Sequence, residues 1–336
     1  MKVAIGISGG VDSAVSALLL KQQGYDVLGI TMKLFEDDSV DKMLDDAKKV
    51  CEEVGIKHII LDLTKEFKEI IINNFIESYK VGLTPNPCVL CNKHFKFGLL
   101  YEKAKELGYN YIATGHYVKI IDNKLCVCDN NKDQSYFLYG IDKNILDKII
   151  FPLKDFENKD EIREIAKKNN LTIFDKKDSQ EICFIKDDDY IKFLENYIIG
   201  KEGNIVDLEG NILGQHTGLY KYTIGQRKGL GISANNPLYV IDIDHVNNQV
   251  IVGNHDELFK GHLIANNVNL LVNELPDTCY AKIRSRGVLA PCKVKYQNNK
   301  LYVTFNEKQR AITKGQSVVL YKDNICLGGG IIDETF

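Results

Sequence analysis

The feature that most constrains this chain is a glycine-rich turn near its start, which reads Ser-Gly-Gly-Val-Asp-Ser over residues 8–13. The apolar run over 3–7 predicts a buried strand before the turn, and the apolar spacing over 12–23 predicts a helix after it. Such a turn lets backbone N–H groups and the positive end of the helix dipole face a phosphate. No Lys follows the glycines, so the turn is not the loop that serves γ-phosphate chemistry. A plain tight turn is the alternative, but the combination of strand, glycines, Asp and helix favours an anion site.

The first third of the chain alternates apolar runs with helical patterns, which is typical of an α/β fold with a parallel sheet covered on both faces. The expected strands are 2–7, 26–32, 57–63 and 111–114, and the expected helices are 12–23, 39–54, 64–81 and 97–107. Ligands of such sheets bind beyond the carboxyl ends of the strands, where Ser8, Met32 and Gly115 fall. We therefore expect a single nucleotide pocket at this edge.

The pattern of helix and strand signals changes along the rest of the chain. Residues 143–170 look helical with a break near Pro152, whereas after residue 200 short β-rich runs alternate with Asn- and Gly-containing turns. The expected strands are 238–243, 249–252, 280–283, 292–296, 301–305 and 317–321. The pattern predicts a catalytic domain over 1–200, a small mainly-β central domain over 201–262 and a C-terminal β-barrel over 263–336.

Composition limits the class of protein. The chain has 336 residues, 44% of them hydrophobic and 26% charged, as in globular proteins of the cytoplasm, and no apolar run reaches the roughly 18 residues that span a membrane. It enters its first strand at once, so we expect no targeting peptide and no membrane partner. Nine cysteines in such a chain indicate thiol or metal chemistry rather than structural disulfides. The net charge of −3 means that a nucleic acid would have to meet a local basic face.

Two segments carry thiols suited to chemistry. Two prolines within 84–93 predict a rigid loop without helix, and this loop carries Cys88 and Cys91 as a C-x-x-C pair. The pair could also be half of a zinc site, with His94 as the nearest further ligand, or two inert thiols. Cys183 lies far away on an apolar segment, where an ordinary packing role is the alternative. We interpret the six other cysteines as packing residues: Cys51, Cys126, Cys128, Cys279, Cys292 and Cys326.

Three clusters suit contact with nucleic acid. Residues 131–137 mix charges, amides and aromatic rings, and residues 216–232 are rich in glycine, basic residues and aromatic rings, although a solvated hairpin would look similar. Lys282, Arg284 and Arg286 alternate as on a strand, so we expect them to share a face that meets phosphates.

Seven blocks in the same order resemble the bacterial tRNA-specific 2-thiouridylases, which belong to the PP-loop ATP pyrophosphatases. The blocks are 6–13, 84–87 with 91–93, 113–117, 132–138, 178–185, 225–232 and 326–332. The resemblance covers nearly the whole chain. It implies ATP-dependent 2-thiolation of the wobble uridine, U34, in tRNAs with Lys, Glu or Gln anticodons. It also implies ATP with Mg²⁺ and a sulfur donor such as a cysteine desulfurase or a sulfur-relay protein.

The resemblance also implies roles for individual residues. Cys91 matches the nucleophile and Cys183 the persulfide carrier, so we expect both thiols to have depressed pKa values. The ATP site would comprise Gly6, Ile7, Ser8, Gly9, Gly10, Val11, Asp12, Ser13, Met32 and Gly115. The tRNA contacts would comprise Asn86, Pro87, Cys88, His116, Lys132, Asp133, Gln134, Arg284, Ser285 and Gln316, to which the basic cluster adds Arg227 and Lys228.

One position departs from the family pattern, because Cys88 stands where the family has Asp. A thiol cannot replace a carboxylate, since its usual pKa is about 8.5 rather than about 4. Three thiols could instead hold a [4Fe–4S] cluster through Cys88, Cys91 and Cys183, with one iron left open. The competing interpretation is the persulfide route, with Cys88 as a bystander or a resolving thiol. Outside this family, the sequence would suit a PP-loop ligase that transfers nitrogen, or a tRNA-binding sulfur-relay protein that does not adenylate its substrate.

Overall fold

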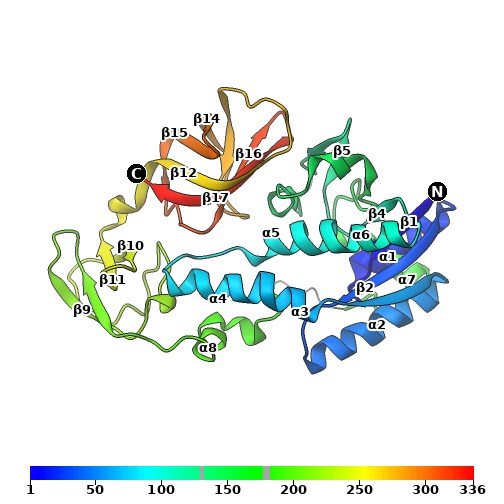
Figure 1. Ribbon diagram of the computed structural model, residues 1–336, viewed down its shortest axis with the longest axis horizontal. Helices are drawn as coiled ribbons and strands as arrows, with labels where there is room; N and C mark the ends of the chain where they lie inside the picture. The colour runs from blue at the N-terminus through cyan, green and yellow to red at the C-terminus, as the bar shows by residue number, and fades with distance from the viewer. Residues whose placement is uncertain (129–131, 177–181) are drawn as a thin grey trace.

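The computed structural model describes residues 1–128, 132–176 and 182–336 and shows three parts (Figure 1). The predicted α/β class, with a mainly-β central part and a C-terminal barrel, is confirmed. The domain boundaries near 200 and 262 stay a prediction. The parallel sheet, at the right in Figure 1, has the order β3-β2-β1-β4-β7. Its strands are β1 (Lys2–Gly6), β2 (Asp26–Lys33), β3 (Lys57–Asp62), β4 (Tyr111–Ala113) and β7 (Ile149–Ile150).

Side-chain alternation along β1 explains the layers. Val3 and Ile5 point to one face and pack among residues of α1 (Val11–Gln22), α2 (Asp38–Val54) and α7 (Lys159–Lys168). Ala4 points to the other face and packs with α6 (Leu100–Glu106). Both faces of the sheet are therefore covered. The strand order reverses its direction between β1 and β4, and a ligand of such a sheet binds at this switch point.

Two long helices extend from the sheet toward the centre of the molecule (Figure 1). The first joins α3 (Thr64–Phe67) to α4 (Asn73–Lys80) through a π-helical turn over 68–72. The second joins α5 (Pro87–Cys91) to α6 through a π-helical turn over 92–99. The predicted loop over 84–93 is therefore wrong from Pro87 onward. Proline is tolerated in the first turn of a helix, because the N–H that it lacks would have no partner there.

The predicted helical stretch over 143–170 is also wrong in part. Residues 143–148 form a 3₁₀ helix, β7 adds a fifth parallel strand, and only α7 is an α-helix. The short helix α8 spans Tyr190–Glu195. Further 3₁₀ turns span Ser135–Phe137, Lys186–Asp188, Leu219–Lys221 and His255–Leu258.

The central part is a four-stranded sheet of order β10-β11-β8-β9, at the left in Figure 1. Its strands are β8 (Gly203–Val206), β9 (Ile212–His216), β10 (Tyr239–Asp244) and β11 (Gln249–Gly253). Its core contains Ile205, Leu230 and Val250. The sequence predicts β10 and β11 but not β8 and β9, because these two are short and interrupted by polar residues.

The C-terminal barrel closes because β12 pairs with both β15 and β17. Its strands are β12 (Phe259–Leu270), β13 (Thr278–Lys282), β14 (Ala290–Gln297), β15 (Lys300–Arg310), β16 (Ser317–Lys322) and β17 (Ile325–Thr335). We did not predict β12 and β17 from the sequence. The glycine run over 328–330 resembles a turn, but a Cβ at Gly329 would lie 2.3 Å from Val318 O. These glycines let neighbouring backbones approach closely within the sheet.

The barrel is joined to the catalytic part through paired strands and buried hydrogen bonds. In the hairpin of β5 (Lys119–Ile121) and β6 (Lys124–Cys126), the second strand pairs with β17. Tyr136 donates its hydroxyl hydrogen to Ser317 O at 2.8 Å, and both groups are buried. One hydrophobic core contains side chains from both parts. The barrel and the parallel sheet therefore pack as one unit.

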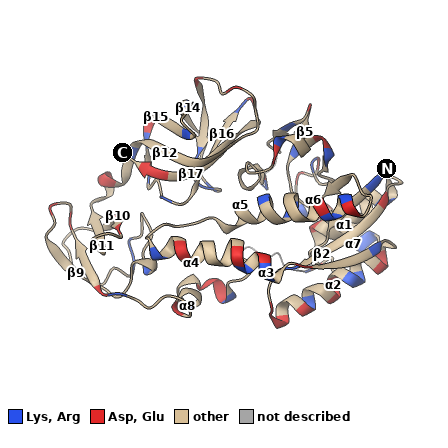
Figure 2. Ribbon diagram, in the orientation of Figure 1, with Lys and Arg blue, Asp and Glu red and all other residues tan. Residues whose placement is uncertain are grey.

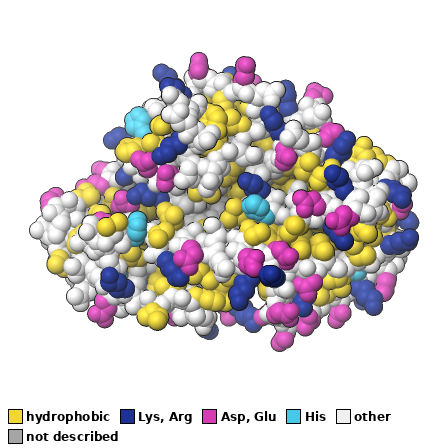
Figure 3. Space-filling model, viewed as in Figure 1, with side chains coloured by type: hydrophobic (Ala, Val, Ile, Leu, Met, Phe, Trp, Pro, Cys, Tyr) yellow, Lys and Arg dark blue, Asp and Glu magenta, His cyan; other side chains and the backbone are white. Residues whose placement is uncertain are grey.

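Charged side chains of both signs mix over the surface, as the outer side of α2 shows in Figure 2 and the viewed face in Figure 3. Such mixing agrees with the small net charge of −3. Among the described residues, no helix is long and apolar enough to cross a membrane.

Candidate active site

The glycine turn after β1 has the geometry that its sequence predicts. Gly9 has a φ of +64°, and a Cβ there would lie 2.9 Å from Met43 O, so only glycine fits. Ser13 Oγ accepts a hydrogen bond from Ser8 N at 3.2 Å and donates one to Gly10 O at 3.0 Å. No side chain of the described residues caps the N-terminus of α1. The first N–H groups of this helix can therefore bind an anion.

Two lysines from distant segments form ion pairs with carboxylates at this turn. Lys159, at the start of α7, donates to Asp12 Oδ2 at 2.8 Å, and Tyr117 donates its hydroxyl hydrogen to Asp12 Oδ1 at 2.7 Å. Lys176 donates to Gly9 O at 2.8 Å and to a carboxylate oxygen of Asp46 at 2.5 Å. We did not predict Lys159, Lys176 and Tyr117 from the sequence, because no local spacing connects them to the turn.

The switch point of the sheet brings the end of β4 against this turn. A Cβ at Gly115 would lie 2.9 Å from the carbonyl carbon of Asp12, so the chain after β4 touches the start of α1. Met32, near the end of β2, is half-buried. The predicted nucleotide residues thus end or follow the neighbouring strands β1, β2 and β4, while their contacts with ATP stay a prediction.

The structure brings the three thiols together. Cys88 and Cys91 are three residues apart on α5 and so lie on one side of the helix. Cys91 packs against the same hydrophobic core as Phe184, the neighbour of Cys183 in the chain. Negative charge on Cys91 or Cys88 raises the pKa of Cys183, so all three thiols lie within electrostatic reach. The side chains of Cys88 and Cys183 are exposed and that of Cys91 is half-buried, whereas the six remaining cysteines are buried, as packing residues should be.

The prediction that Cys91 and Cys183 have depressed pKa values is wrong. Burial raises the pKa of the Cys91 thiol to about 11 and that of the Cys183 thiol to about 12. Burial also raises the pKa of Cys88. Although Cys88 and Cys183 expose part of their surface, protein atoms around the sulfur remove enough water to disfavour the thiolate. The positive charge of Lys96 lowers all three pKa values, but by less than burial raises them.

Lys96, whose charge acts on the three thiols, lies in the π-helical turn. It lies five residues after Cys91 within 92–99, and a π turn closes its hydrogen bonds over five residues rather than four. Its ammonium group lies 3.4 Å from Nε2 of His116, whose Nδ1 lies 2.7 Å from Thr114 Oγ1. Burial and Lys96 lower the pKa of His116 well below its usual range, so the ring is neutral. A neutral ring can accept from Lys96 and donate to Thr114.

The described residues contain no group of three His, Cys, Asp or Glu side chains arranged to hold a metal ion. Cys88, Cys91 and Cys183 therefore do not converge on a single metal ion, and a [4Fe–4S] cluster held by these three thiols stays a prediction. The same finding leaves the zinc interpretation of Cys88, Cys91 and His94 without support from geometry.

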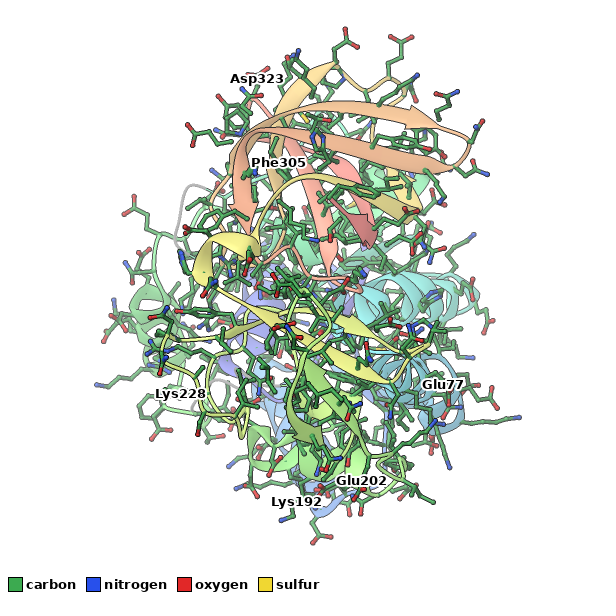
Figure 4. The ribbon with its side chains drawn as sticks, turned by 90° about the vertical axis from the view of Figure 1, so that its left-hand side faces the viewer. Glu77, Lys192, Glu202, Lys228, Phe305 and Asp323 are labelled. Carbon is green, nitrogen blue, oxygen red and sulfur yellow. The ribbon has the colours of Figure 1, made fainter. Side chains whose placement is uncertain are left out.

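Some of the predicted tRNA residues have exposed side chains, whereas others form hydrogen bonds within the protein. Lys132, Arg227, Lys228 and Arg284 are exposed, and Figure 4 shows Lys228 at the edge of the central part. The strand argument for Lys282, Arg284 and Arg286 is wrong, because β13 ends at Lys282.

Other predicted tRNA residues bond within the protein. Asp133 accepts from Cys128 N at 3.1 Å, Gln134 Oε1 accepts from Tyr117 N at 3.0 Å, and Gln316 Nε2 donates to Thr84 O at 2.9 Å. The remaining ones are only partly accessible or buried: Asn86, Pro87, His116 and Ser285. Their roles toward tRNA stay predictions. Residue 131 and residues 177–181, which include the start of the block with Cys183, lie outside the described residues.

A glycine turn at the switch point of a parallel sheet, with added lysines and neighbouring thiols, is the site of a PP-loop protein of the ATP pyrophosphatase class. Three family models match consecutive segments: the tRNA methyl transferase HUP domain over 1–187, the tRNA methyl transferase PRC-barrel domain over 191–254 and the aminomethyltransferase beta-barrel domain over 260–332. Relatives named tRNA-specific 2-thiouridylase MnmA match almost from end to end, so the chain belongs to the tRNA-specific 2-thiouridylase family.

Three relatives show the extent of this match. The protein of Clostridioides difficile (strain 630), named tRNA-specific 2-thiouridylase MnmA, is 46% identical over 99% of this chain and 98% of its own. Two others are named tRNA-specific 2-thiouridylase MnmA 1. That of Clostridium tetani (strain Massachusetts / E88) is 49% identical over 99% of this chain and 96% of its own. That of Fusobacterium nucleatum subsp. nucleatum is 47% identical over 99% of this chain and 94% of its own.

Proposed function

We propose that this protein replaces O2 of the wobble uridine of tRNA by sulfur, in a reaction driven by ATP, in the cytoplasm. The proposal rests on the presence of both an anion-binding glycine turn and three neighbouring thiols in one domain. Neither half alone would suffice, because the turn supports adenylation and the thiols support sulfur transfer. Two of the matching domain models are named for methyl transfer, but the neighbouring thiols favour sulfur chemistry.

The first half-reaction activates the base. O2 of the uridine attacks the α-phosphate of ATP, and pyrophosphate leaves. The N–H groups of the turn at 8–13 and the ammonium groups of Lys159 and Lys176 stabilise the charge that develops on the departing pyrophosphate. Asp12 is suited to share a Mg²⁺ ion with the phosphates, since carboxylate and phosphate oxygens are ligands that Mg²⁺ prefers.

The second half-reaction delivers sulfur. A persulfide on Cys183 attacks C2 of the adenylated uridine, and AMP leaves. Cys91 then attacks Sγ of Cys183, which frees 2-thiouridine and closes a Cys91–Cys183 disulfide that an external thiol must reduce. The raised pKa values of Cys91 and Cys183 keep both thiols protonated until a substrate or a persulfide changes their surroundings.

Partners follow from this chemistry. We take tRNAs with Lys, Glu or Gln anticodons as substrates and a cysteine desulfurase or sulfur-relay protein as donor. The target base must leave its stack, because O2 is hidden in a duplex. The exposed Arg227, Lys228 and Arg284 are suited to the tRNA backbone.

A second route is favoured by one observation, which is that Cys88 lies near Cys91 and Cys183. The three thiolates could hold a [4Fe–4S] cluster, each on a different iron, with the fourth iron left open. Protein prepared without oxygen and reconstituted with iron distinguishes the routes. Loss of iron and activity together in Cys88→Ser supports the cluster, whereas colourless protein without iron that still thiolates tRNA excludes it.

The main proposal is tested with purified protein, ATP, Mg²⁺, an unmodified transcript of a glutamate-type tRNA, and a cysteine desulfurase with cysteine and a thiol reductant as the source of sulfur. Nucleoside mass spectrometry should find 2-thiouridine only when ATP is present. Release of pyrophosphate that depends on tRNA separates this enzyme from a sulfur-relay protein that does not adenylate. An amidated product would indicate a ligase, and the absence of both 2-thiouridine and pyrophosphate would contradict the proposal.

A further inference from the structure

The segment that leads into α5 lies between the two accessory parts of the molecule. Residues 82–86 follow α4 and end at Pro87, the first residue of the helix that carries Cys88 and Cys91. In Figure 1 this connection passes between the central sheet and the barrel. We call residues 82–86 the thiol-helix lead. Its position determines where α5 begins.

The barrel holds the lead through a turn that precedes β16. Thr84 N donates to Lys314 O at 3.0 Å, and Gln316 Nε2 donates to Thr84 O at 2.9 Å and to Pro85 O at 3.4 Å. Gly315 has a φ of +88°, and a Cβ there would lie 2.9 Å from Thr84 N. One turn of the barrel thus bonds both backbone groups of Thr84.

The turn itself is fixed within the barrel. Gly315 N donates to Ile332 O and Ile332 N donates to Gln316 O, each at 2.8 Å, so the turn is tied to β17. A displacement of β17 would therefore be transmitted to Thr84 rather than absorbed by a slack loop.

The central sheet holds the lead from another side. Gly82 has a φ of +73°, and a Cβ there would lie 2.5 Å from Cγ2 of Ile243 on β10. Lys314 donates from Nζ to both carboxylate oxygens of Asp242, at 2.9 and 3.1 Å, which connects the barrel turn to the same strand. Barrel, central sheet and lead therefore meet at one junction.

We propose that Lys314 and Gln316 are positioning residues, which fix the thiol-helix lead between the barrel and the central sheet and so set the placement of Cys91 relative to Cys183. This inference rests on the proposed thiolation. It gives Gln316 a role different from the direct tRNA contact that the family resemblance implies. A misplaced nucleophile slows the chemical step more than it weakens binding, and a shift of about 1 Å can cost about 100-fold in rate.

The test measures kcat and KM for tRNA in thiolation by the full chain, with Cys183 loaded by a cysteine desulfurase and cysteine. Gln316→Leu and Lys314→Met should each lower kcat, by about tenfold and about threefold, with KM unchanged within about twofold. Lys314→Arg should restore kcat, because it keeps a cation opposite Asp242. Gln309→Leu is the matched control, since Gln309 lies on β15 of the same barrel and its amide donates to the nearby Glu307 O at 2.8 Å.

A second readout needs no tRNA. Mild oxidation with diamide should form the Cys91–Cys183 disulfide several-fold more slowly in Gln316→Leu than in the wild type or in Gln309→Leu. A raised KM with unchanged kcat and unchanged disulfide formation would overturn the inference and make Gln316 a tRNA contact. Wild-type kinetics in both variants would overturn it as well. A wild-type protein that forms no 2-thiouridine would overturn the proposed function, and this inference with it.

Discussion

The glycine turn and the thiol site differ in how they treat negative charge. The turn at 8–13 presents the first N–H groups of α1, which favour an anion, and Lys159 and Lys176 are paired there with Asp12 and Asp46. At the thiol site burial raises the pKa of Cys91 and Cys183, so an anion is disfavoured until the surroundings change. Under the proposed function, the first site would receive the phosphates of ATP in the free protein, whereas the thiols of the second site stay protonated and unreactive. This contrast means that sulfur transfer can be delayed until tRNA and persulfide have arrived.

Substitutions at the two sites should separate the half-reactions most strongly. Asp12→Ala should lower tRNA-dependent pyrophosphate release by about 100-fold or more, because it removes the carboxylate at the phosphate site. Cys183→Ala should abolish thiolation with sulfur loaded as a persulfide yet leave pyrophosphate release within a few fold. Both rates are measured on the same tRNA transcript. Full thiolation by Asp12→Ala would remove the turn from the mechanism, and an absence of pyrophosphate release in Cys183→Ala would mean that the two sites do not act separately.

The pH dependence of alkylation tests directly whether the thiols stay protonated in the free protein. In the free protein without iron, alkylation of Cys91 by iodoacetamide should accelerate about tenfold per pH unit from neutral pH upward. The increase should continue to near the raised pKa of about 11. The rate of alkylation rises with pH because only the thiolate reacts, and burial shifts the formation of the thiolate to higher pH. Free glutathione is the control and should level off nearer its own, lower pKa. Levelling of Cys91 near pH 7 would contradict the contrast between the two sites.

The basic residues outside both sites should affect binding alone. Replacing Arg227 and Lys228 together by Ala should weaken tRNA binding and reduce the log–log salt slope by about one unit for each phosphate that the protein no longer neutralises. The adenylation and thiolation rates at saturating tRNA should not change. Equilibrium binding at several salt concentrations measures the slope, and Lys192→Ala, at an exposed position on α8, is a suitable control. An unchanged slope would show that these two charges are merely solvated.

The weakest effect concerns the stability of the thiol region. The pKa of His116 is lowered from its ordinary value of 6.5, so below about that pH the unfolded chain binds a proton that the folded chain does not. Stability should therefore fall as the pH decreases from 6.5, by at most about 1.4 kcal/mol per pH unit from this residue. His116→Gln should flatten the pH dependence of the urea midpoint in this range. A variant with the same slope as the wild type would contradict the lowered pKa, because the ring would then bind a proton equally well in the folded and the unfolded chain.

Local patterns explain which predictions were confirmed. Strand β1, the turn at 8–13 and helix α1 were predicted because apolar spacing, glycine conformation and helix formation act between neighbouring residues. The loop prediction at 84–93 fails because proline breaks the interior of a helix but not its first turn, and Pro87 stands in the first turn of α5. The sequence does not predict strand β17, because its glycine run resembles a turn. These glycines are instead required by the close approach of neighbouring strands in the sheet, which local spacing does not show.

The amino-acid sequence alone was enough to predict the features whose residues are neighbours in the chain. These are the anion-binding turn, the pair Cys88 and Cys91, and the sequence blocks that identify the family. What surrounds them depends on the packing of the whole chain. That packing brought Cys183 near Cys91, aimed Lys159 and Lys176 at the turn, and raised the thiol pKa values. It also placed Gln316 of the barrel on the lead to α5. The physical reason is that spacing along the chain encodes hydrogen bonds and side-chain faces within one element, while burial and charge at a site depend on every element packed around it.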